Sequence, residues 1–172
     1  MRKFLPALCI AAFLVSCSQV DSAKKDLSIP AVPTTVETAK ATLKNKSYGV
    51  EEIGTIDLFH EYDWSASADT TAFIRDYLTE RKAFTLRFVN DTAVNVSDDK
   101  KLIEATYDLK KDTGTALLLD IHYFDSSFSF NPGEPTRMTY NYKLLGISNE
   151  NLLLETPRKL NQRKLVLLMK SK

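Results

Sequence analysis

Cysteine, histidine and glycine are scarce in this chain. Its 172 residues include 2 cysteines, 2 histidines and 5 glycines. So few glycines leave little material for the loops that hold phosphate groups, and neither an HExxH nor a GxSxG motif occurs. The sequence therefore predicts a protein that is not an enzyme and that carries no cofactor.

An excess of charge of one sign is also lacking. The chain has 23 basic and 22 acidic residues, and two of the basic ones, Arg2 and Lys3, lie within the first 16 residues. The remainder thus has one more acidic than basic residue, which argues against nucleic acid as a partner. One basic cluster lies near the C-terminus: Arg158, Lys159, Arg163 and Lys164. We interpret it as a solvated hairpin turn, with contact to anionic lipid headgroups as the alternative.

An apolar run occupies the N-terminus. Residues 4–15 are almost all apolar and follow two positive charges, which is typical of a secretory signal. This run of about a dozen residues is shorter than the roughly 20 that a membrane-spanning helix needs. The four residues Leu14-Val15-Ser16-Cys17 resemble the lipobox of bacterial lipoproteins. In that family the cysteine is lipidated and the chain is cut just before it.

The lipobox resemblance implies a signal peptide at residues 1–16 and lipidation of Cys17, so that a lipid holds the N-terminus in a membrane. Cys9 leaves with the signal, so neither a disulfide nor a thiol nucleophile remains. Ser18, rather than an aspartate, resembles lipoproteins that are passed on to an outer membrane. We therefore expect the protein in the bacterial cell envelope, at the outer membrane.

The chain after the lipobox divides into a tether and a domain. Residues 17–33 are polar with spaced prolines, and predict a flexible tether that reaches on the order of 20 Å from the membrane. Residues 34–172 predict one domain with a single core. Helical spacing predicts a short helix at 35–44 and a second helix at 68–82, between the first two strands.

Alternation of apolar and polar residues predicts eight strands in this domain. Their ranges are 47–59, 84–90, 92–97, 101–110, 115–124, 137–148, 152–156 and 164–170. Short turns make neighbouring strands antiparallel, and eight strands close into a barrel whose interior holds side chains or one small ligand. The expected fold is an up-and-down antiparallel β-barrel, and a two-sheet sandwich is the alternative.

The order of elements over residues 40–170 is similar to that of lipocalin-like bacterial lipoproteins. The turn at 142–154 and the last strand at 164–169 carry this resemblance, whereas the Gly-x-Trp motif of lipocalins is absent from residues 43–48. The resemblance implies a barrel that binds a small apolar or amphipathic ligand. Tyr48 is the residue that we expect to close the barrel floor in place of the tryptophan.

Aromatic residues on the predicted strands are the candidate ligand contacts. They are Phe88, Tyr107, Tyr140 and Tyr142. Tyrosines give an apolar wall with a polar tip that orients a ligand. Alternatively the same rings fill the core. In that case the protein is a filled-barrel envelope protein that binds a partner through residues 124–135, with Phe128 and Phe130 as the contacts.

The two histidines are the remaining candidates for chemistry. Asp120 and His122 share one face of a strand because they are two residues apart. Together with His60 and Asp63 they would supply ligands of the kind that zinc binds. We interpret them as a polar outer face and a loop residue, so the sequence predicts no metal site.

Overall fold

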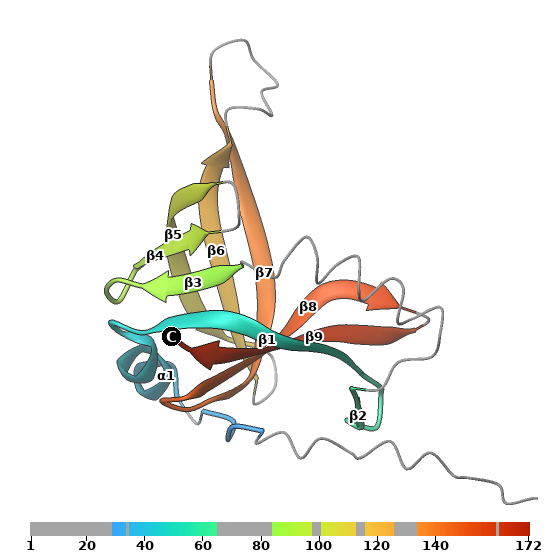
Figure 1. Cartoon of the computed structure of the whole chain (residues 1–172). Helices are drawn as coiled ribbons and strands as arrows, with labels where there is room; N and C mark the ends of the chain where they lie inside the picture. The colour runs from blue at the N-terminus through green and yellow to red at the C-terminus, as the bar shows by residue number, and fades with distance from the viewer. Residues whose placement is uncertain are drawn as a thin grey trace, which may run out of the picture.

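The computed structural model describes residues 29–33, 35–64, 84–97, 101–112, 116–125, 134–160 and 162–172. These residues form one helix and nine strands (Figure 1). The elements are α1 (Val36–Leu43), β1 (Ser47–Ile56), β2 (Tyr62–Asp63), β3 (Thr85–Phe88), β4 (Ala93–Ser97), β5 (Leu102–Lys111), β6 (Leu117–Asp125), β7 (Thr136–Ile147), β8 (Asn151–Leu160) and β9 (Arg163–Ser171).

Strand β1 closes the sheet into a barrel. Every neighbouring pair of strands is antiparallel, in the order β1-β3-β4-β5-β6-β7-β8-β9, and β9 pairs again with β1. On its other edge, β1 pairs with β3 over its first three residues and with β2 over its last two. The predicted eight-stranded antiparallel barrel is therefore confirmed, and the sandwich alternative is wrong.

Three elements differ from the predicted set. Strand β1 ends at Ile56, three residues before the predicted end at 59, because the chain turns back at residues 57–61. The two-residue strand β2 was not predicted, because so short a segment shows no alternation. Strand β8 continues four residues past the predicted end at 156. The helix predicted at 68–82 lies outside the described residues.

Helix α1 confirms the helix predicted at 35–44. Its N-cap is Thr35, whose hydroxyl oxygen accepts a hydrogen bond from the Thr38 amide at 3.1 Å. Ala39 and Leu43 are fully buried against the barrel core. In the described part of the chain, no helix is long and apolar enough to cross a membrane.

The barrel interior is filled by the inward-facing residues of all eight strands. Cross-strand neighbours such as Leu119 opposite Tyr142, and Leu154 opposite Leu167, place large side chains face to face. Most of these residues expose less than a tenth of their surface. Burial on this scale supplies the main driving force for folding, since the barrel has no disulfide in the described residues.

A second apolar cluster lies on the outer face of β1, β8 and β9. Its buried members alternate with the inward-facing ones, and they are Ile56, Leu153, Val166 and Leu168. Tyr62 of β2 and Trp64, which follows β2 directly, pack against this cluster. A Cβ at Gly54 would overlap the Trp64 ring, so the glycine lets the ring lie close to β1. Strand β2 thus holds two aromatic rings over an apolar outer face.

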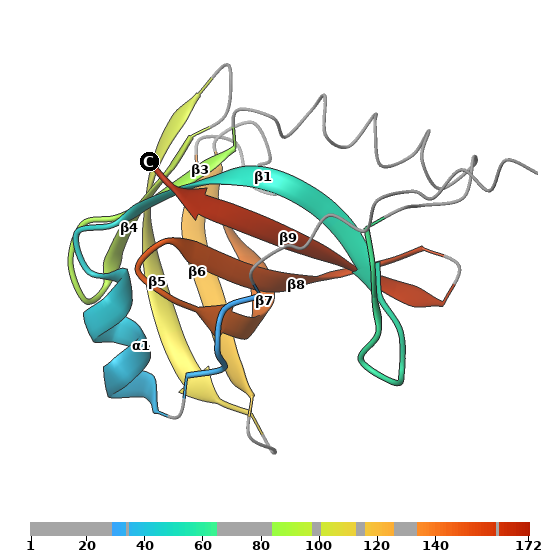
Figure 2. The same ribbon diagram turned by 60° about the horizontal axis from the view of Figure 1, so that its bottom comes forward.

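The N-terminal strap (residues 29–33) lies across the end of β7 (Figure 2). Pro30 and Pro33 are buried, and the Ile147 amide donates a hydrogen bond to the Ala31 carbonyl oxygen at 2.9 Å. Gly146 lies where the register between β7 and β8 shifts, and its missing side chain makes room for the Pro30 carbonyl. Packed contacts with the barrel therefore begin inside the segment predicted as a tether.

We expect Gly146→Ala to destabilise the protein by about 1–3 kcal/mol, because the added methyl group overlaps the Pro30 backbone. Urea unfolding measures this loss, and limited proteolysis measures release of the strap. Gly49→Ala is the matched control, because the Cβ there meets only the flexible end of the Lys172 side chain. Equal losses in the two variants would contradict the role of Gly146.

Candidate functional site

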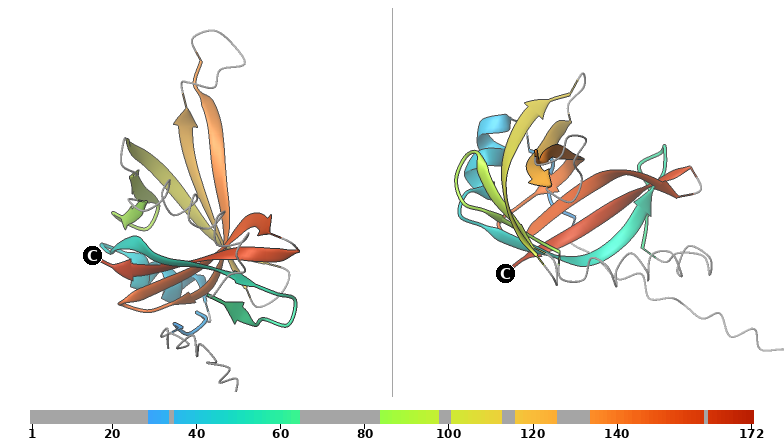
Figure 3. Two further views of the ribbon diagram at one scale, coloured as in Figure 1. Left: turned by 45° about the vertical axis from the view of Figure 1, so that its right-hand side comes forward. Right: turned by 90° about the horizontal axis from the view of Figure 1, so that it is seen from above.

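Strands β7 and β8 separate partway along the barrel. They pair from Ile147–Leu152 to Lys143–Glu155, and beyond that point β7 continues beside β6 and β8 beside β9. Figure 3 shows β6 and β7 rising away from β8, β9 and β1. Pro157 lies just past the last pair and has no N–H to donate to a ladder. The proline thus lies where the seam begins; the seam is our name for the opening between residues 136–142 and 156–160.

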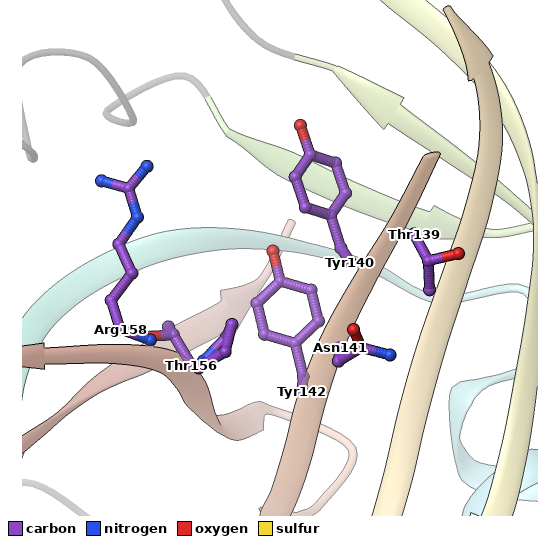
Figure 4. A pocket seen from close by; sticks show the side chains of 7 residues that line it. Thr139, Tyr140, Asn141, Tyr142, Thr156 and Arg158 are labelled. Carbon is purple, nitrogen blue, oxygen red and sulfur yellow. The ribbon is translucent and has the colours of Figure 1, made fainter. Parts of the chain in front are cut away.

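A cavity of about 100 Å³ lies in the seam. It is lined from β7 by Thr139, Tyr140, Asn141 and Tyr142, and from β8 by Thr156, Pro157 and Arg158 (Figure 4). Pockets that enclose drug-sized ligands measure about 300–1,000 Å³. This cavity therefore fits a small molecule, or one end of a larger molecule that continues along the seam.

Three tyrosines form a row along the β7 side of the seam. The ring centroids of Tyr123 and Tyr140 are 5.0 Å apart with the planes 22° from parallel, and those of Tyr140 and Tyr142 are 6.4 Å apart. Figure 4 shows the hydroxyls of Tyr140 and Tyr142 pointing the same way, with the Arg158 guanidinium on the facing strand. The cavity thus has aromatic faces on one side and a cation on the other.

The other two aromatic candidates lie in the packed end of the barrel. Phe88 is fully buried, with its ring 5.1 Å from Tyr107 and 6.3 Å from Tyr48, edge to face in both pairs. Tyr48 donates to the Ser148 carbonyl oxygen and Tyr107 donates to the Asn90 carbonyl oxygen, each at 3.0 Å. These three rings therefore close one end of the barrel and do not border the cavity.

A polar network covers the outer face of β5, β6 and β7. Asp120, although on the outer side, is 5% exposed and accepts hydrogen bonds from Lys110 and, at 2.7 Å, from Asn141. Burial raises the pKa of Asp120, but these two hydrogen bonds outweigh it and hold that pKa below its usual value. The carboxylate is thus kept charged, and through Asn141 it orders one wall of the cavity.

His122 lies in the next row of the same network. Its Nδ1 is 2.9 Å from the Thr139 hydroxyl and its Nε2 is 3.3 Å from an Asp108 carboxylate oxygen. The order hydroxyl, imidazole, carboxylate is that of a nucleophile triad, but the Asp108 side chain is 68% exposed on an open sheet face. Within the described ranges, no three His, Cys, Asp or Glu residues cluster to hold a metal ion. His60 lies in the turn before β2.

The site residues predicted from the sequence therefore lie in different parts of the structure. Tyr140 and Tyr142 lie together at the cavity, whereas Phe88 and Tyr107 lie in the packed end. Cys17, Phe128 and Phe130 are outside the described residues. Thr156 and Pro157 were not predicted as site residues, and the signal that points to them is a proline directly after an apolar strand.

In comparisons with known proteins, no family model, no curated protein and no solved structure matches this chain.

Burial raises the pKa of both Tyr48 and Tyr107 to about 12, from a usual value near 10. The fold favours the neutral phenols, so their contribution to stability is complete below pH ~10 and is lost as the pH rises toward ~12. Tyrosinate absorbance should therefore show a late titration step that coincides with falling resistance to urea. Tyr107→Phe should remove part of that step, and an unchanged titration curve would contradict the assignment.

Proposed function

We propose that the protein is a lipid-anchored, lipocalin-like binding module of the bacterial cell envelope that takes a small amphipathic ligand at the seam. The cavity between β7 and β8 supports this proposal more than any other observation, because it joins tyrosine rings to a cation at an opening of the barrel. Such a combination suits a ligand with an apolar body and an anionic head.

The lining residues contact different parts of the proposed ligand. The rings of Tyr140 and Tyr142 offer apolar faces to the ligand body, and Tyr142 is 7% exposed, so only a thin molecule reaches along it. Arg158 is exposed on β8, and its guanidinium is of the kind that binds carboxylate and phosphate groups through two parallel hydrogen bonds. A carboxylate or phosphate monoester on a short apolar chain is the ligand class that fits.

The lipobox supports the anchor. A lipid on Cys17 with two or more acyl chains makes membrane attachment stable, since each buried CH₂ contributes about 0.8 kcal/mol. The strap then holds the barrel end of the tether, leaving residues 18–28 as the link between membrane and barrel. A binding module at that position meets the amphiphiles of the envelope.

A second function, binding of a partner protein through the β6–β7 loop, has one observation in its favour. Phe124, at the end of β6 where the hairpin rises beyond the barrel, is 66% exposed (Figure 1). Exposed aromatic side chains of this kind are enriched where proteins bind each other. Failure of the wild-type chain to bind any amphiphile would favour this function.

The ligand proposal is tested by calorimetry with decanoate and decanol, which share one chain and differ in the charge of the head. We expect Arg158→Gln to weaken decanoate binding about 10- to 100-fold, since a hydrogen bond to a charged group contributes about 1.5–3 kcal/mol. Decanol binding should be unchanged. Arg137→Gln, an exposed arginine of β7 outside the cavity, is the control. Equal affinities in all three proteins would refute the site.

The anchor is tested by metabolic labelling with a palmitate analogue in bacteria that express the full chain. The wild type should incorporate label and lose residues 1–16. Cys17→Ala should do neither, because the thiol that accepts the lipid is gone. Cys9→Ala should behave as the wild type, and label in the Cys17→Ala protein would contradict the lipobox assignment.

A further inference from the structure

The turn between β1 and β2 carries two large apolar side chains in full contact with solvent. Leu58 is 87% exposed and Phe59 is 86% exposed, the highest values among the large apolar residues that the structure describes. Single exposed apolar residues are common on protein surfaces, but an adjacent pair at a protruding hairpin tip is not. We call residues 58 and 59 the tip.

The backbone of this turn is closely defined. The Asp57 amide donates to the Glu61 carbonyl oxygen and the His60 amide donates to the Asp57 carbonyl oxygen, both at 3.2 Å. His60 has a φ of 64°, which completes a three-residue hairpin loop. One carboxylate oxygen of Asp57 also accepts from the amides of Phe59 and Glu61, each at 2.9 Å. The tip therefore projects because its backbone is held in that shape.

Arg163 of β9 braces the base of the same turn. Its guanidinium reaches the Asp57 carboxylate at 3.3 Å, the Thr55 hydroxyl at 2.8 Å and the Glu61 carbonyl oxygen at 2.9 Å. These contacts use donors on all three of its nitrogens, so the arginine ties β1, the turn and β9 together. The tip is thus exposed because these contacts fix the hairpin in a shape that projects it into solvent.

The surroundings of the tip have the composition of a membrane interface. Behind it, the rings of Tyr62 and Trp64 stack 5.8 Å apart and 9° from parallel, and both are partly exposed. The neighbouring β8–β9 hairpin adds the exposed cation Lys159. Tyrosine, tryptophan and snorkelling cations are the side chains that favour the headgroup region of a bilayer.

We propose that the tip inserts into the interfacial region of a bilayer and orients the barrel on the membrane. Two side chains are too few for a stable protein–protein interface, which buries about 1,000 Å² or more. The strap lies on the same side of the barrel as the β1–β2 hairpin in Figures 1 and 3, so the first described residues lie on the side that carries the tip. The proposal rests on the lipid anchor proposed above and is independent of the ligand site.

The lipid anchor makes such a weak contact effective. A tether from Cys17 to the strap spans on the order of 20 Å, which holds the tip within reach of the bilayer. Binding of the tip then becomes an intramolecular step at high effective concentration. Close ion pairs, Arg163 with Asp57 and Lys164 with Glu155, balance much of the charge nearby, so the contact depends on apolar insertion and little on salt.

The experiment moves the single tryptophan to the tip. The full chain with Trp64→Phe and Phe59→Trp is reconstituted in phosphatidylcholine vesicles whose acyl chains are brominated or unbrominated. We expect its emission to be about twofold lower in brominated vesicles, because the indole lies among the lipids. Adding Leu58→Ser should reduce that quenching. The control chain, with Trp64→Phe and Leu102→Trp, places the indole at a side chain that is 65% exposed on β5, where no quenching is expected.

Each other outcome overturns the proposal. Equal emission of the tip reporter in the two kinds of vesicle shows that the tip stays out of the bilayer. A blue shift that grows with protein concentration and shows no bromine quenching assigns the tip to a second copy of the chain. Flotation separates the anchor from the tip: a chain that floats without tip quenching refutes the tip contact alone, and a chain that does not float refutes both.

Discussion

The pairing of β1 with two different neighbours is the constraint on which the rest of the structure depends. One edge of β1 is occupied by β9 over nearly its whole length, and the other edge is shared between β3 and β2. Because β1 is the first strand of the barrel and pairs with the last, β9, closure of the barrel requires both ends of the domain. The rings of Tyr62 and Trp64 and the turn held by Arg163 lie on the outer side of this closing region.

Strands β7 and β8 pair at one end of the barrel and separate at the other, and the backbone N–H groups differ between the two ends. Strands β7 and β8 pair from Ile147 to Lys143, with one register shift between Leu144 and Gly146. At Pro157 the donor is missing, and β8 follows β9 alone through an irregular register. The interior is therefore solid around Phe88 and opens beside Tyr142, so one barrel contains both a packed core and a cavity.

Much of the fold was predictable from alternation, and the site was predictable only in part. Residues 103–109 alternate so regularly that the strand and its buried face follow from the sequence. The aromatic residues Phe88 and Tyr140 look alike in sequence, yet one is sealed in the core and the other borders the seam. That difference depends on which neighbour each strand keeps, a long-range property that local pattern does not contain. Pro157 was the one sequence signal for the seam, because a residue without an N–H can end the pairing of two strands.

If a lipid on Cys17 holds the N-terminus as proposed above, the strap determines how force reaches the barrel. Load applied through the tether reaches the hydrogen bond between Ala31 and Ile147 and the contact at Gly146 before it reaches any ladder between strands. Detachment of residues 29–33 from β7 would lengthen the proposed tether by on the order of 15 Å while the barrel stays folded. With the proposed anchor in place, the strap would detach before any barrel strand when the distance between membrane and barrel changes.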